Sequence, residues 1–103
     1  MIVSTKNIVD ILAEHNSSSY NSSKLQEECL ELALILIQIA NKPAKIAAEK
    51  PDEKYKEIAD VLLRLDIFYK SLTPEEQALI EKFQKEKKEK YVKWYTSGKY
   101  PEI

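Results

Sequence analysis

Two pairs of acidic residues are spaced so that each pair could bind one ion. Glu28 and Glu31 lie three positions apart, and so do Glu57 and Asp60. Residues with this spacing share one face of a helix, with Cβ atoms about 5–6 Å apart, so both carboxylates of a pair can point toward one position. Both pairs enter apolar segments, where ionised carboxylates are unfavourable unless cations compensate them. The pattern therefore indicates a four-carboxylate site shared by two helices.

The ligand type predicts which ion such a site would bind. Sites made only of oxygen ligands select Mg²⁺, Mn²⁺ or Ca²⁺ over zinc. The chain has a single histidine and a single cysteine, which excludes a Cys/His zinc cluster. Mg²⁺ usually keeps positions free for water or phosphate oxygens. We therefore predict Mg²⁺, with Mn²⁺ as a substitute, held by Glu28, Glu31, Glu57 and Asp60.

The same residues also have a simpler interpretation as surface charges. The pattern Glu-x-x-Glu is common on solvated helix faces, and Asp60 and Arg64 have the spacing of an ordinary surface ion pair. Two acidic pairs that each enter an apolar segment favour the metal site over this interpretation.

The residues around the two pairs also resemble a known signature. Residues 24–32 read KLQEECLEL, and residues 57–62 read EIADVL. Together they resemble the E-x-x-E, spacer, E-x-x-D pattern of the MazG-like all-α nucleoside triphosphate pyrophosphatases. The likeness is firm over residues 24–69 and loose beyond them. It departs from the family at Cys29 and Leu30, where many members carry small residues.

This resemblance implies a reaction and roles for the acidic residues. Glu28, Glu31, Glu57 and Asp60 would be both metal ligands and catalytic residues. A metal-activated water would attack a nucleoside triphosphate, yielding a nucleoside monophosphate and pyrophosphate, in housekeeping of a nucleotide pool. A phosphoribosyl-ATP pyrophosphatase has a similar acidic layout and stays open as an alternative. A helical interaction module without catalysis is the other alternative.

Three lysines are candidates for binding the substrate. In the family a basic pair on the last helix often reaches the phosphates, which implies this role for Lys90 and Lys93, three positions apart. Lys24 precedes the acidic cluster and could orient Glu28 or contact phosphate. A solvated helix face of alternating Glu and Lys is the simpler interpretation of the last helix.

Hydrophobic periodicity and capping signals predict four helices in one all-α domain over residues 1–103. The second helix is expected to begin at an S-x-x-Q capping box of Ser23 and Gln26, after a polar connector over 16–23. A Thr73-Pro74-Glu75-Glu76 box is expected to begin the last. The intervening segment 43–51 is expected to form one or two turns. The helices are predicted over 5–14, 23–41, 51–71 and 73–97.

The second predicted helix is apolar nearly all round over residues 32–40, so several neighbours must cover it. Three short helices of one chain would not suffice, which favours a helical bundle completed in a homodimer or homotetramer. The resemblance implies the same assembly.

Composition narrows the other partners and the location. A net charge of −1 does not indicate nucleic acid or a membrane as the main partner. The only glycine is Gly98, which excludes a P-loop and a dinucleotide-binding fingerprint. The amino terminus does not resemble a signal peptide, and the longest apolar run, residues 32–37, is too short to span a bilayer. We therefore expect a soluble, cytoplasmic protein.

Overall fold

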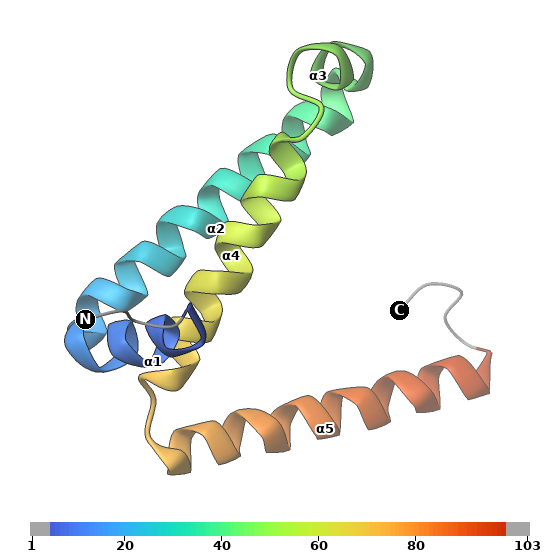
Figure 1. Cartoon of the computed structure of the whole chain (residues 1–103). Helices are drawn as coiled ribbons and strands as arrows, with labels where there is room; N and C mark the ends of the chain where they lie inside the picture. Colours follow the sequence, from blue (N-terminus) through green and yellow to red (C-terminus); the bar gives the residue numbers. More distant parts are fainter. Residues whose placement is uncertain (1–4, 99–103) are drawn as a thin grey trace. The chain divides into compact units, whose positions relative to one another are not determined.

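The computed structural model describes residues 5–98, which form helices joined by short connections, with no strand in that range (Figure 1). The all-α class predicted from the sequence is therefore confirmed. Five helices form instead of four, because the segment between the second and third predicted helices makes a short helix of its own. The helices are α1 (Thr5–His15), α2 (Ser18–Asn41), α3 (Pro43–Glu49), α4 (Glu53–Lys70) and α5 (Pro74–Ser97).

Helix α2 begins earlier than predicted. Its N-cap is Ser17, whose hydroxyl oxygen accepts a hydrogen bond from the backbone N–H of Tyr20 at 3.1 Å. Ser23 lies inside the helix, and Gln26 donates to the hydroxyl of Ser22 at 3.1 Å, so the expected capping box does not form. Several serines in succession offered equivalent caps, and the earliest one is used. The helix has 24 residues and is about 36 Å long.

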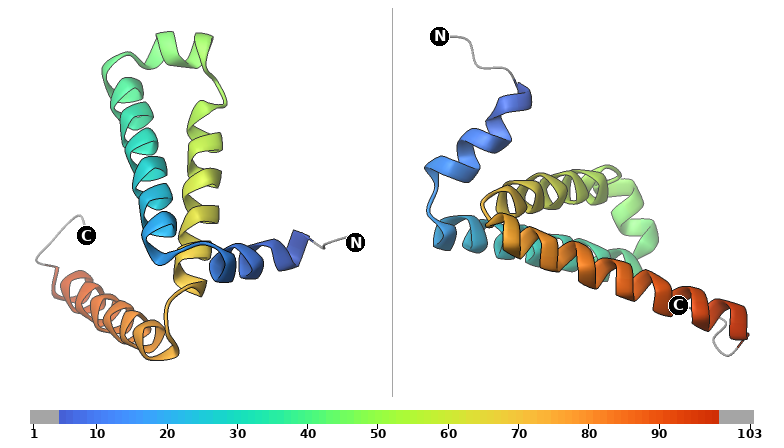
Figure 2. Two further views of the ribbon diagram at one scale, coloured as in Figure 1. Left: turned by 90° about the vertical axis from the view of Figure 1, so that its left-hand side faces the viewer. Right: turned by 90° about the horizontal axis from the view of Figure 1, so that it is seen from below.

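Two prolines determine how the chain turns between α2 and α4. Lys42 and Lys50, which precede Pro43 and Pro51, adopt nearly the same non-helical conformation, with φ −140° and ψ 63° at Lys42 and φ −138° and ψ 59° at Lys50. A residue before proline disfavours the helical conformation, so α2 and α3 each end there. The turn brings α2 and α4 side by side (Figures 1 and 2). This helical hairpin is the scaffold of the candidate site.

The core of the first four helices is small. Each helix contributes one buried apolar residue, namely Ala13, Ile35, Ile46 and Ile67. Asn21 is the buried polar residue, and its side-chain oxygen accepts a hydrogen bond from the amide of Asn16 at 3.2 Å. Much of the apolar surface of α2 and α4 is therefore left exposed.

Helix α5 belongs to a separate compact unit, which begins at Leu72, whereas the first unit ends at Ser71. The predicted capping box is confirmed, because Glu76 N–H donates to Thr73 Oγ1 at 3.1 Å and Thr73 N–H donates to Glu76 Oε1 at 3.0 Å. The hydrogen bond from the Thr73 backbone lowers the pKa of Glu76. The helix ends at Gly98, whose φ of 66° favours glycine. The single domain over 1–103 stays a prediction.

The expectation about membranes can be tested on the helices over residues 5–98. None of them combines the length and the apolar character needed to cross a bilayer.

Candidate metal centre

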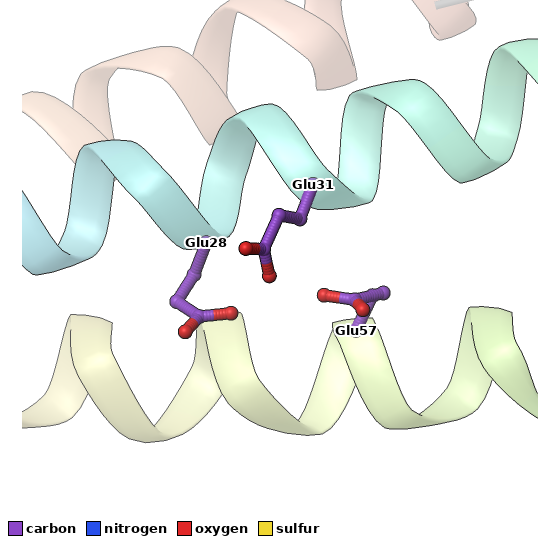
Figure 3. Close-up of side chains that lie close together, drawn as sticks. All are labelled: Glu28, Glu31 and Glu57. Carbon is purple, nitrogen blue, oxygen red and sulfur yellow. The ribbon is translucent and has the colours of Figure 1, made fainter.

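Three of the four predicted carboxylates meet between α2 and α4. Glu28 and Glu31 extend from α2 toward α4, and Glu57 extends from α4 into the same space (Figure 3). One carboxylate oxygen of each residue lies within 4.8 Å of the other two. The three-residue spacing places the first two on one face of α2, and the hairpin brings Glu57 opposite them. These residues could bind one cation together.

Asp60, the fourth predicted ligand, lies outside this group of three. It is exposed on α4, three residues after Glu57. Its negative charge nevertheless contributes to raising the pKa of Glu28, so it acts on the same cluster from the side of Glu28. Its role as a ligand stays a prediction.

Two oxygens of the cluster have no hydrogen-bond partner among residues 8–98. They are Oε2 of Glu28 and Oε2 of Glu57, and both are shielded from solvent. Shielded polar atoms without a partner are unfavourable, and native proteins contain few of them. Glu31 is the exposed member of the cluster. The arrangement suits a cation that binds the two shielded oxygens and is reached past Glu31.

Burial and like charge raise the pKa of two carboxyl groups in the cluster. Burial contributes most to raising the pKa of Glu57 to about 7, followed by the negative charge of Glu31 and hydrogen bonding with Glu53 and Glu31. Burial also leads in raising the pKa of Glu28, followed by the charges of Glu31 and Asp60. Close carboxylates resist simultaneous ionisation, so a proton or a cation is needed to compensate them.

One part of the surface-charge interpretation agrees with the structure, because Glu31 and Asp60 are exposed, and another part does not. Asp60 and Arg64 form no ion pair in the part of the chain that the structure describes. The ion pair closest in sequence to the cluster joins Lys24 Nζ to Glu27 Oε2 at 3.2 Å, and the Lys24 ammonium also lies 5.7 Å from the centroid of the Tyr20 ring. That Lys24 contacts phosphate stays a prediction.

The other two predicted substrate-binding lysines lie on α5, in the second unit. Lys90 Nζ lies 4.7 Å from the centroid of the Trp94 ring. Lys93 is exposed. Their contact with phosphate also stays a prediction.

A pocket of about 140 Å³ adjoins the cluster, and the sequence analysis missed part of its lining. Glu31 and Glu57 line it together with Gln38, Lys50 and Glu53. Two of the missed residues had a sequence signal, because Gln38 follows Glu31 by two helical turns and Glu53 precedes Glu57 by about one. Lys50 had none, since its position depends on how α3 joins α4.

No protein-family model, curated protein or solved structure shows a significant match to this chain. The chain is described by its own structure as a helical hairpin with three converging glutamates between its two long helices, α2 and α4. The resemblance to MazG-like enzymes rests on the two acidic motifs alone.

Proposed function

We propose that this chain is a cytoplasmic Mg²⁺-dependent nucleoside triphosphate pyrophosphohydrolase, which converts (d)NTP to (d)NMP and pyrophosphate in nucleotide-pool housekeeping. The observation that carries the proposal is the convergence of Glu28, Glu31 and Glu57 between α2 and α4. These residues come from both acidic motifs, which lie 25 or more positions apart in the sequence.

The residues present fit a hard divalent cation. All donors are carboxylate oxygens, two of them shielded and without a hydrogen-bond partner among the described residues. Glu28, Glu31 and Glu57 would hold Mg²⁺, with Asp60 acting from the side of Glu28. When bound, Mg²⁺ supplies positive charge for phosphate oxygens and lowers the pKa of water.

The carboxyl groups have distinct tasks in this proposal. Glu57, with a pKa of about 7, holds a proton for much of the time near neutral pH, and this proton must leave before its oxygen can act as a ligand. Glu31 and Glu57 lie both in the cluster and in the adjoining pocket, so they would link the ion to the place where phosphate would lie, with Glu31 as the exposed member. Positioning and charge are the main requirements of phosphoryl-type transfer, so a catalytic histidine is not needed.

The proposal includes self-association as a homodimer or homotetramer that completes a MazG-like four-helix bundle. Large apolar side chains on both long helices are solvent-exposed, including Leu30 at 72% and Leu62 at 61%, with Leu34 and Ile37 also exposed. Exposed apolar surface of this kind often marks an interface. Light scattering at micromolar concentration should report twice or four times the 11.9 kDa of one chain. A mass of one chain at high concentration would contradict this part of the proposal.

The function is tested by a screen for pyrophosphate release from common and damaged (d)NTPs. Release should require Mg²⁺ or Mn²⁺ and should stop in excess EDTA. Glu57→Gln should abolish it, whereas Asp66→Asn, an exposed change on the same helix and outside the pocket, should not. Release of inorganic phosphate alone, or full activity in EDTA, would refute the assigned reaction. Preference for phosphoribosyl-ATP would favour that alternative enzyme, and no turnover of any substrate would favour the interaction module.

A further inference from the structure

A second pocket, of about 260 Å³, lies where α2 meets α3. Three lysines are the main charged groups of its lining, against one carboxylate. They come together because Lys42 and Lys50 flank the two ends of α3, a helix only about 10 Å long, and Lys45 lies between them. The polar residues that line the pocket are Gln38, Asn41, Lys42, Lys45, Glu49 and Lys50.

The three ammonium groups have no carboxylate partner. None of them forms an ion pair within 4.0 Å among residues 8–98, although Glu49 lines the same pocket. Each lysine offers three hydrogen-bond donors and no acceptor. Like charges gathered around one concave site repel each other, so an anion placed among them would relieve that repulsion. The pocket therefore has the chemistry of an anion site.

This basic pocket shares two lining residues with the acidic one. Gln38 and Lys50 line both the 260 Å³ pocket and the 140 Å³ pocket beside Glu31 and Glu57. Glu31 and Gln38 are seven positions apart, which places them on one face of α2, and Lys42 is the C-cap residue at the end of that helix. Gln38 is about 10 Å from Glu31 along the helix axis. The hairpin thus has a cation-binding region followed directly by a region suited to anions.

We propose that Lys42, Lys45 and Lys50 bind the phosphate chain of the substrate while other oxygens of the same chain approach the cation at Glu28, Glu31 and Glu57. The inference rests on the proposed function for the identity of the ligand. It adds the orientation of the bound substrate, because the polyphosphate would lie along α2 from the carboxylates toward α3. Of the three lysines, Lys50 is the one that lines both pockets.

Calorimetric binding of inorganic tripolyphosphate, with and without Mg²⁺, tests this inference on the full chain. Lys45→Gln/Lys50→Gln removes two of the three charges, and Lys70→Gln is the matched control, because Lys70 is exposed on α4 and lines neither pocket. The double variant should bind tripolyphosphate on the order of tenfold more weakly, as expected when charge-assisted hydrogen bonds are lost. The control should bind it as the parent does. The affinity of the parent and of the double variant for Mn²⁺ alone should be equal. If the double variant does not fold, Lys45→Gln alone, at an exposed helical position, serves for the same comparison.

Each outcome separates this inference from the proposed function. Selective loss of tripolyphosphate affinity with unchanged Mn²⁺ affinity supports the basic subsite. Equal affinity in parent and variant, equal weakening in Lys70→Gln, or no binding by the parent overturns it. The proposed function is judged on the parent alone, by release of pyrophosphate from (d)NTPs, so a hydrolytic parent with unaffected lysine variants would refute only the subsite.

Discussion

Pairs of charged residues three positions apart occur both in the α2–α4 hairpin and on α5, but the two regions bury them differently. On α5, Lys90 and Lys93 repeat the three-residue spacing of Glu28 and Glu31, yet no described residue of that helix is buried. Two of its lysines lie over neighbouring rings, with Lys87 Nζ 5.4 Å from the centroid of Tyr91 and Lys90 Nζ 4.7 Å from that of Trp94.

In the hairpin, α4 packs against α2, so the carboxylates of the two helices come close together. Carboxylates from α2 and α4 face one another, two of their oxygens are shielded without a hydrogen-bond partner among the described residues, and burial raises the pKa of Glu57 to about 7. A three-residue spacing therefore becomes a candidate site only where another element packs against it. Charged residues alone do not distinguish a site from a solvated helix face.

The largest expected effect is on turnover. Glu31→Gln should lower pyrophosphate release by about 100-fold or more, because even groups one layer beyond a metal's ligands change affinity or activity by 10–100-fold. Glu86→Gln, an exposed change on α5, should leave the rate unchanged. Initial rates at saturating Mg²⁺ measure both. Equal rates for Glu31→Gln and Glu86→Gln would show that the carboxylate cluster is no more important for turnover than the exposed face of α5.

The next effect is on thermal stability. Mg²⁺ at about 100 times its dissociation constant should stabilise the parent by about 2.7 kcal/mol. For a domain of this size that is a rise in melting temperature on the order of 10 °C, at fixed protein concentration. Glu31→Gln should lose most of this rise and should be as stable as the parent, or more so, without metal, because it relieves like-charge repulsion.

If Glu31 has only a structural role, we expect the opposite effects on stability. Glu31→Gln would then weaken the metal-free fold, and Mg²⁺ would matter little to either protein. Melts of both proteins with Mg²⁺ and with EDTA distinguish the two cases. The same rise in parent and variant would exclude Glu31 from the metal centre.

The sequence predicted the helical class, and three of the four predicted ligand positions converge in the structure. Periodicity along one helix predicts the helices and places Glu28 and Glu31 on one face, whereas Glu57 meets them because α4 packs against α2. Prediction from the sequence failed where the outcome depends on competition or on tertiary placement. Ser17 and Ser23 were both suitable caps, and local pattern could not choose between them. Pro51 predicts that α3 ends at Lys50, but which pockets Lys50 lines depends on how α3 packs beside α2 and α4, which no spacing rule indicates.

The smallest expected effect is a pH dependence that belongs to the hairpin alone. In metal-free protein, the pKa of Glu57 is raised from its ordinary value of 4.5 to about 7. Between these pH values the folded protein retains a proton that the unfolded chain has released. The free energy of unfolding should therefore fall as the pH rises from about 4.5 to 7, with no further contribution from this group beyond that window. Denaturant unfolding in EDTA across the window measures the slope.

Two variants and added Mg²⁺ test whether Glu57 causes this pH dependence of the free energy of unfolding. Glu57→Gln carries no titrating group at this position, so its stability should fall less steeply with pH, whereas Glu86→Gln on α5 should keep the slope of the parent. Saturating Mg²⁺ favours the ionised carboxylate, so it should stabilise the folded state more at pH 8 than at pH 5 and flatten or reverse the slope. If Glu57→Gln and Glu86→Gln have the same slope, the pH dependence arises outside the cluster, and the carboxyl of Glu57 ionises as an ordinary surface group does.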